Sequence, residues 1–398
     1  MLSGKTIVLG VTGSIAAYKI ANLVRMIKKL GGNVHVMMTK NAENFINPIT
    51  FETLSQNKCL VDTFDRNFQY SVEHVAIAKQ ADVVMIAPAS ANVIGKIVNG
   101  IADDMLTTTV MACPCTKIIA PAMNHNMYHN PIVQDNIDKL RGYGYIIAEP
   151  ERGMLANGDM GDGRMIEESE LLEYILREVS DKDLASKRVL ITAGATMESI
   201  DPVRYITNRS TGRMGMALAR AAALRGADVT VIKGHTEVGT PYFVNVIETE
   251  SAEDMYNAVI DNAQDFDIII KAAAVADFTP ASVADEKIKK TDSASSIELC
   301  RTKDILKALG ESRKDGQFIC GFSMETQNLI ENSKDKLKKK NIDMICANSL
   351  KTEGAGFGCD TNVVTVITKD CEKPLPKLSK FECANAILDE IVKGVDSL

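Results

Sequence analysis

Residues 6–39 read TIVLGVTGSIAAYKIANLVRMIKKLGGNVHVMMT. The apolar run Thr6–Gly10 predicts a strand, and a tight turn containing Gly13 follows it. Apolar residues at helical spacing predict an amphipathic helix over Ile15–Leu30, and a glycine pair ends it before a second strand at Asn33–Met38. This strand–turn–helix–strand order is typical of an α/β domain.

The same order recurs in the second half of the chain, within Arg188–Gly234. A strand at Val189–Ala193 leads into a long polar loop, a helix at Gly212–Arg225 and a strand at Asp228–Ile232. The recurrence predicts two independent α/β starts. Further apolar strands are predicted at Asp82–Ala87, Lys117–Ala120, Asp267–Ala274, Asp343–Ala347 and Val363–Thr368.

The length of 398 residues exceeds what one hydrophobic core usually covers. We interpret the polar stretch 180–187 as a linker, which gives domains at 1–180 and 186–398. Continuous apolar strands alternating with helices predict parallel sheets covered by helices on both faces. Ligands of such sheets bind beyond the carboxyl ends of the strands.

Composition excludes several classes of protein. The net charge of −7, the absence of tryptophan and the 5% aromatic content argue against nucleic acid as a partner. No apolar run is long enough to span a bilayer, and the chain enters a strand without a signal peptide, so we expect a cytoplasmic protein. Nine irregularly spaced cysteines indicate reduced thiols, and the pair Cys113 and Cys115 is interpreted as structural rather than metal-binding.

In the N-terminal half, each predicted strand ends in small or polar residues. Gly10–Lys19 offers backbone N–H groups at a helix start, which suits a phosphate. Pro88–Asn92 combines small side chains with hydrogen-bonding groups, so a flat ring can approach the backbone. Thr107–Thr109 adds hydroxyls, Pro121–Asn124 follows a further strand, and Gly153–Met165 forms a glycine-rich flap.

Taken in series, these motifs resemble the flavin-containing cysteine decarboxylases over roughly the first 175 residues. The resemblance implies an active-site histidine at His74 and a carboxylate-binding residue at Asn124. It also implies bound FMN, held by Gly13, Ser14, Thr39, Ser90, Asn92 and Thr107. Taken alone, a histidine before a helix is more often a capping or core residue than a catalytic one.

The flap departs from the family pattern at one position. Members that act on phosphopantothenoylcysteine carry a cysteine after Leu-Ala as the proton donor, and Asn157 stands there in this chain. Because a carboxamide is no acid near neutral pH, the departure predicts an impaired final protonation. A trapping substitution or another proton donor would also explain it.

Two further histidines, His125 and His129, stand four residues apart. That spacing imitates zinc ligands, but the sequence shows no third ligand beside them. We interpret both as structural or rim residues.

In the C-terminal half, the loop Ile200–Gly215 leads into a helix and lacks both a Gly-x-Gly-x-x-Gly and a Walker-type motif. Its Arg204 and Asn208 suit an anionic substrate. Two lysine clusters, at 286–290 and 336–340, fit a triphosphate with Asp277 holding Mg²⁺, although a lysine run is more often a solvated helix face.

These residues resemble the phosphopantothenate–cysteine ligases over about 186–395. The resemblance implies CTP as co-substrate, with Arg204 and Asn208 acting on an acyl-cytidylate and Lys287 as a catalytic residue that holds the nucleotide. The implied nucleotide pocket comprises Ala272, Ala273, Asp277, Lys287, Lys303, Asp304, Ile305, Leu306, Phe322, Lys336 and Lys340. The family's Asn-Pro before Asp304 is replaced by Thr302-Lys303 in this chain.

Fused in this order, the two halves are similar to the bifunctional enzymes of bacterial coenzyme A biosynthesis. The resemblance implies two Rossmann-like three-layer α/β domains, a flavodoxin-like flavin domain followed by a ligase domain. It also implies condensation of 4'-phosphopantothenate with cysteine, then decarboxylation to 4'-phosphopantetheine, in a homo-oligomer with trimeric flavin domains and dimeric ligase domains. Two alternatives remain open: a flavin-binding scaffold without turnover, and a flavodoxin-like redox enzyme with an NAD domain.

Overall fold

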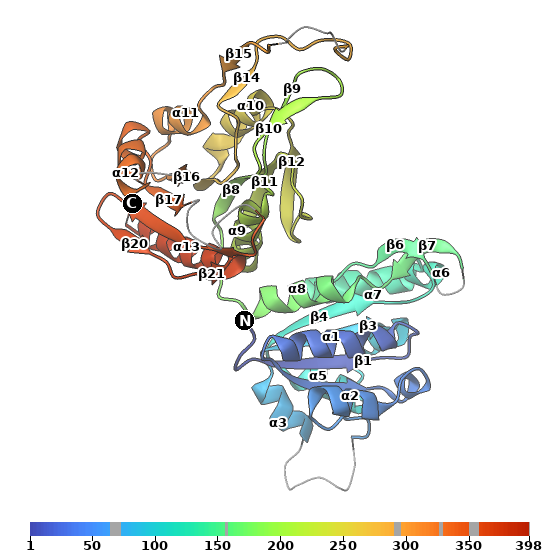
Figure 1. The fold of residues 1–398 in the computed structure, drawn as a ribbon. Coiled ribbons are helices and arrows are strands. Elements are labelled where there is room, and N and C mark those ends of the chain that lie inside the picture. The colour runs from blue at the N-terminus through green and yellow to red at the C-terminus, as the bar shows by residue number, and fades with distance from the viewer. Residues whose placement is uncertain (64–72, 156–157, 290–295, 326–328, 350–357, 398) are drawn as a thin grey trace. The chain divides into compact units, whose positions relative to one another are not determined.

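The computed structural model divides into two compact units, Met1–Ser180 and Asp181–Leu398 (Figure 1). Each unit is described by itself. The structure describes residues 1–63, 73–155, 158–289, 296–325, 329–349 and 358–397.

The first unit is built around one sheet. In chain order its elements are β1 (Thr6–Val11), α1 (Ala17–Lys29), β2 (Asn33–Met38), the 3-10 helix η1 (Lys40–Asn44), α2 (Pro48–Ser55), α3 (Glu73–Gln80), β3 (Val83–Ala89), α4 (Ala91–Val98), α5 (Met105–Ala112), β4 (Thr116–Pro121), α6 (His125–Tyr128), α7 (Pro131–Gly142), β5 (Ile146–Ile147), β6 (Glu151–Met154), β7 (Met160–Arg164) and α8 (Glu168–Val179).

Five parallel strands form this sheet in the order β2-β1-β3-β4-β5. That order is flavodoxin-like, and the chain changes direction across the sheet between β1 and β3. Helices α1 and α8 pack together over one face, whereas α3, α4, α5 and α7 cover the other. The apolar strands are therefore buried on both faces, as in β3, where every residue is buried.

The second unit is larger. Its elements are β8 (Arg188–Ala193), β9 (Met197–Ser199), β10 (Tyr205–Thr207), α9 (Arg213–Leu224), β11 (Asp228–Lys233), β12 (Val244–Glu248), α10 (Ala252–Asn262), η2 (Ala263–Asp265), β13 (Ile268–Lys271), β14 (Phe278–Pro280), β15 (Leu299–Arg301), α11 (Ile305–Ser312), β16 (Phe318–Glu325), α12 (Leu329–Lys339), β17 (Met344–Ser349), β18 (Thr361–Asn362), β19 (Val364–Thr368), β20 (Glu372–Pro374), β21 (Leu378–Ser379) and α13 (Lys380–Val395).

Its main sheet has the order β12-β11-β8-β13-β16-β17-β19-β20. The six strands up to β17 are parallel and follow the Rossmann order, with the change of direction between β8 and β13. Helices α9 and α13 cover one face, and α10, α11 and α12 cover the other. Both units are thus three-layer α/β structures, as the sequence predicts.

Two expectations need correction. Strand β19 runs antiparallel to β17, and β20 runs antiparallel to β19, where the sequence predicted parallel strands. Strands β19 and β20 form a hairpin closed at Thr368 and Cys371, and such antiparallel edge strands are common beside parallel sheets. The predicted linker is also partly folded: Leu184 is buried against the second unit, and Asp183 pairs with Arg225 there.

None of the described helices combines the length and the apolar character that crossing a lipid bilayer requires.

Candidate active sites

A hollow of about 640 Å³ lies at the carboxyl ends of the strands in the first unit. It opens where the loops after β1 and β3 meet, which is the change of direction in the strand order. Five of the predicted flavin contacts line it, and so does the predicted substrate residue Asn124. These five are Gly13, Ser14, Thr39, Ser90 and Asn92.

One buried hydroxyl joins the two loops. Thr12 Oγ1 donates to the carbonyl of Pro88 at 2.6 Å and accepts from the backbone N–H of Ser90 at 2.9 Å. The next residue, Gly13, lies against Asn41, and a Cβ at Gly13 would come within 2.8 Å of the Asn41 Cβ. The backbone of both loops is therefore held close together beside the hollow.

Thr39 carries the most direct sign of a missing ligand. Thr39 lines the hollow, and its buried Oγ1 has no hydrogen-bond partner within the described part of the chain. A buried hydroxyl without a partner costs roughly 1–3 kcal/mol. The hollow therefore suits a polar ligand, and the hydroxyls, carboxamides and small residues around it fit a flavin mononucleotide.

Thr107 acts indirectly. Its side chain is fully buried, and its hydroxyl donates to Asp104 Oδ1 at 2.8 Å. Asp104 and its ion-pair partner Lys96, 3.1 Å away, line the hollow instead. Thr107 is not among the residues that line the hollow, and its connection to the hollow runs through Asp104.

A second hollow of about 560 Å³ adjoins the first, sharing Ser14 and Asn124 with it. Lys19 and Arg164 line it, and both pair with Glu167, Lys19 at 2.9 Å. The ammonium of Lys19 lowers the pKa of Glu167 below its ordinary value. Two cations on one wall suit an anionic substrate group, and the sequence reasoning missed both residues.

The hairpin of β6 and β7 closes this second hollow. Gly163 accepts a hydrogen bond from the Met123 N–H at 3.0 Å and has φ +117°. A Cβ at Gly163 would lie 2.3 Å from the Met123 carbonyl oxygen, so the close approach requires glycine. The side chain of His74, at the start of α3, and the whole of Asn157 lie outside the described residues.

In the second unit, a long segment, residues 194–212 between β8 and α9, lies at the point where the strand order changes direction. We call this segment the strap. The Asn208 carboxamide donates to the Ala274 carbonyl at 3.0 Å, just beyond the end of β13. The Ala274 N–H in turn donates to the Gly194 carbonyl at 2.8 Å. Asn208 therefore sits where a Rossmann-like sheet binds its ligand.

The Arg204 guanidinium forms hydrogen bonds with other groups of the protein. Its Nε donates to Asp201 at 2.9 Å, and its guanidinium also donates to the Ile288 carbonyl at 3.0 Å. The guanidinium holds the pKa of the buried Asp201 far below its usual range. Asp201 also accepts from the Ile288 N–H at 3.2 Å, so Arg204 and Asp201 together anchor the backbone next to the exposed Lys287.

Three lysines converge near the ends of β13 and β16. Burial, followed by the positive charges of Lys340 and Lys336, lowers the pKa of Lys271 to about 8. Lys340 pairs with Asp304 at 2.8 Å, and Lys336 lies 3.4 Å from the Ser323 hydroxyl. Mutual repulsion of this kind indicates a site for an anion. The sequence reasoning named Lys336 and Lys340 and missed Lys271.

Five of the other predicted nucleotide residues fall into two groups. Ala273, Ile305 and Leu306 are core residues under α10 and α11, whereas Ala272 and Phe322 pack on the α9 side. The side chain of Lys303 is directed toward α10: its ammonium pairs with Glu253 at 2.9 Å and lies 5.1 Å from the Tyr256 ring centroid. Asp277 is exposed beyond the end of β13.

Two family models match the chain. Residues 1–180 match the flavoprotein family, and residues 184–395 match the C-terminal domain of the DNA/pantothenate metabolism flavoproteins. The chain is thus a flavoprotein with a C-terminal domain of this second type.

Relatives match over the full length. The chain is 46% identical to the coenzyme A biosynthesis bifunctional protein CoaBC of Bacillus subtilis, covering 98% of this chain and 97% of that one. It is 38% identical to the protein of that name from Escherichia coli, covering 99% and 98%. The chain belongs to the family of coenzyme A biosynthesis bifunctional proteins.

Among solved structures, the C-terminal domain of a coenzyme A biosynthesis bifunctional protein CoaBC is 41% identical to this chain. It covers 55% of this chain and 100% of its own length, with a TM-score of 0.47.

Proposed function

We propose that this chain joins 4'-phosphopantothenate to cysteine with CTP and then decarboxylates the product to 4'-phosphopantetheine. Membership of a family of bifunctional enzymes over the whole length supports the assignment. The observation that carries the flavin half is the hollow at the β1/β3 change of direction, with the unpaired Thr39 hydroxyl on its wall.

In the decarboxylase half, FMN is the proposed cofactor, and when bound it would remove a hydride from the substrate and return it after CO₂ has left. Gly13, Ser14, Thr39, Ser90 and Asn92 would hold it. Asn124 lines both hollows, so it stands between the cofactor and the substrate.

The substrate itself would occupy the second hollow, where Lys19 and Arg164 offer positive charge to its anionic groups. Its carboxylate would accept a hydrogen bond from Asn124. His74 is proposed as the active-site histidine on the strength of its motif.

In the ligase half, the pantothenate carboxylate would attack the α-phosphate of CTP, releasing pyrophosphate and giving an acyl-cytidylate. The cysteine amine would then displace CMP. Lys271, Lys336 and Lys340 supply the positive charge that the phosphates require. Asp277 is the proposed Mg²⁺ residue, because magnesium is commonly held by one or two carboxylates together with substrate phosphates.

Lys287 and Asn208 would contact the acyl intermediate from two sides of the site. Asn208 is fixed by its bond to Ala274, and Lys287 is adjacent to the backbone that Asp201 and Arg204 anchor. Lys287→Gln should therefore reduce acyl-cytidylate formation and leave the flavin absorbance unchanged, because the two units have separate cores.

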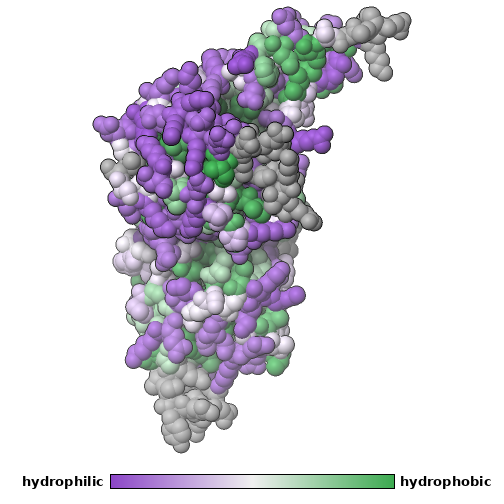
Figure 2. All heavy atoms as spheres, turned by 60° about the vertical axis from the view of Figure 1, so that its left-hand side comes forward, coloured by the Kyte–Doolittle hydropathy of each residue, from purple (hydrophilic) through white to green (hydrophobic). Residues whose placement is uncertain are grey.

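The ligase unit has an exposed apolar surface suited to a second copy of the chain. Figure 2 shows apolar side chains gathered on the arm that carries β14 and β15. Phe278, Val283, Ile297 and Leu299 on this arm are each 46–56% exposed. This surface supports the proposal of dimeric ligase domains, and Leu299→Glu should weaken self-association measured by light scattering. Trimeric flavin domains remain a proposal from the family resemblance alone.

Asn157 concerns the last step of the decarboxylase reaction, the protonation of the enethiolate carbon. A carboxamide cannot deliver the proton that the enethiolate carbon needs. We expect slow turnover and accumulation of an enethiol, and we expect Asn157→Cys to restore the saturated product.

The test of the whole proposal is a product analysis by mass with 4'-phosphopantothenate, cysteine and CTP. We expect CTP-dependent pyrophosphate release and phosphopantothenoylcysteine. We then expect CO₂ to be lost from phosphopantothenoylcysteine. Rapid multiple turnover to saturated phosphopantetheine would refute the role assigned to Asn157. Absence of pyrophosphate release would refute the ligase assignment.

A further inference from the structure

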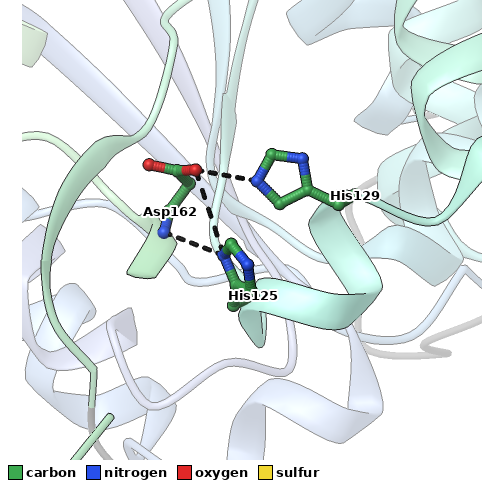
Figure 3. A group of neighbouring side chains, drawn as sticks. All are labelled: His125, His129 and Asp162. Atoms are coloured by element: carbon green, nitrogen blue, oxygen red, sulfur yellow. Dashed lines mark hydrogen bonds and ion pairs between the residues drawn. The ribbon is translucent and has the colours of Figure 1, made fainter. Parts of the chain in front are cut away.

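A cluster of two histidines and one carboxylate lies where α6 and the β6–β7 hairpin of the flavin unit meet (Figure 3). His129 Nε2 is 2.7 Å from Asp162 Oδ2, and His125 Nδ1 is 3.9 Å from the same oxygen. One ligand atom from each residue lies within 4.8 Å of the others. Among the described residues, this is the one group of three histidine, cysteine or acidic side chains with that geometry.

The sequence showed only the two histidines. Asp162 reaches them because the β6–β7 hairpin folds back over α6, and Gly161 permits the close approach. A Cβ at Gly161 would come within 2.9 Å of the His125 ring. The Asp162 N–H also donates to His125 Nδ1 at 3.1 Å, so the hairpin and α6 are already joined at this point.

The spacing is close to that of a tetrahedral metal centre. Zinc bonds of about 2.0–2.1 Å to nitrogen and oxygen place neighbouring ligand atoms about 3.4 Å apart. The separations of the Asp162 oxygen from the two ring nitrogens, 2.7 and 3.9 Å, lie on either side of that value. A shift of the carboxylate toward His125 by less than about 1 Å would equalise them.

Chemistry and access favour an ion as well. Two imidazoles and a carboxylate are a common three-residue ligand set for Zn²⁺, and they leave a fourth position for water. The side chains of His125, His129 and Asp162 are 42%, 49% and 34% exposed, so a hydrated ion can reach them. Coordination would replace two hydrogen bonds: the one that the Asp162 N–H donates to His125 Nδ1 and the one that the Asp162 carboxylate accepts from His129 Nε2.

We infer that His125, His129 and Asp162 form a binding site for a divalent transition-metal ion of the zinc class. The ion clips the β6–β7 hairpin onto α6. Gly163 and Arg164, the next residues of the hairpin, line the second hollow, so the clip also fixes one wall of that hollow. This inference depends on the geometry of the cluster and not on the proposed reactions.

Two substitutions separate metal binding from the existing hydrogen bonds. In His129→Gln the amide can still donate to Asp162, and in His125→Asn the amide oxygen can still accept from the Asp162 N–H. Neither carboxamide replaces an imidazole as a zinc ligand. His235→Gln is the matched control, because His235 is exposed and lies in the second unit.

The experiment is equilibrium dialysis of the full chain against ZnCl₂, followed by metal analysis. We expect the unmodified chain and His235→Gln to retain about one equivalent of zinc more than His125→Asn or His129→Gln. Zinc held by cysteine thiols is the same in all four proteins and cancels in the comparison. Equal zinc content in all four proteins would overturn the inference.

A second measurement needs no substitution. Diethylpyrocarbonate modifies accessible imidazoles, and mass spectrometry of peptides locates the modified histidines. Zinc should protect His125 and His129 while His235 reacts at an unchanged rate. Equal modification of His125 and His129 with and without zinc would also overturn the inference.

Discussion

The two units share one architectural plan and prepare their ligand sites differently. In the flavin unit the hollow is already formed, since Thr12 joins the loops after β1 and β3 by two short hydrogen bonds. In the ligase unit the corresponding position is covered by a long strap, held through Asn208 and through Asp201 with Arg204. A formed hollow suits a resident cofactor, whereas a strap suits substrates that enter and leave in each cycle.

The two sites also differ in the surroundings of their positively charged side chains. Each cation beside the flavin hollows is paired: Lys96 with Asp103 and Asp104, and Lys19 with Glu167. In the ligase unit, burial is the largest cause of the lowered pKa of Lys271; the charges of Lys340 and Lys336 add to it, while Asp304 and Asp277 oppose it. A triphosphate, the proposed ligand, would favour the charged form of Lys271 and so oppose both effects.

The largest expected effect tests whether the two sites work separately. His74→Asn should reduce CO₂ release by about 10³-fold, in the range that loss of an acid–base residue produces. The flavin absorbance and CTP-dependent pyrophosphate release should not change. The measurement is CO₂ release from phosphopantothenoylcysteine by the purified variant. Full decarboxylation would return His74 to a capping role.

The second prediction compares two lysines of the ligase unit. Lys340→Gln removes a charge from the lysine cluster and should lower pyrophosphate release about 10-fold to 100-fold, mainly through a higher KM for CTP. Lys303→Gln is the matched control, because its ammonium pairs with Glu253 on the surface, and we expect less than about a threefold change. Similar losses in both variants would place the triphosphate elsewhere.

Much of the fold could be predicted from sequence because buried parallel strands are continuous apolar runs. The predicted strand Asn33–Met38 is confirmed residue for residue, and Arg188–Ala193 begins one residue before its prediction. The β16 strand was not recognised as one, since Gly321 and polar residues interrupt its apolar pattern. The direction of β19 could not be predicted, because periodicity carries no information on direction.

The candidate sites were predictable where loops follow strands and not where distant segments meet. Ser90 and Asn92 follow β3 directly, so the rule on strand ends locates them. Asp162 meets His129 from 33 residues away, and Arg204 pairs with Asp201. Both arrangements depend on how a hairpin or a strap folds back, which spacing along the chain does not report.

A third, smaller effect concerns the formed hollow. Thr39→Val removes the buried hydroxyl that lacks a partner, so the protein without flavin should be equally stable or about 1 kcal/mol more stable. The same variant should bind FMN about tenfold more weakly, because it loses one hydrogen bond to the ligand. Fluorescence quenching and thermal unfolding measure the two quantities. Unchanged FMN affinity would remove Thr39 from the cofactor site.

The smallest effect is a proton taken up by Lys271. In the free protein, burial and the charges of Lys340 and Lys336 lower the pKa of Lys271 to about 8, so about half of its side chains are neutral at pH 8. A bound triphosphate favours the charged form and raises that pKa, so binding must take up protons at a pH between the two pKa values. We expect an uptake of about half a proton per CTP at pH 8, falling toward zero near pH 6.5, and an affinity that decreases as the pH rises above 8.

Calorimetry in two buffers with different ionisation enthalpies measures the uptake. Lys271→Met should abolish it while leaving Lys336 and Lys340 in place. If the uptake persists in that variant, another group titrates on binding, and Lys271 does not belong to the nucleotide site.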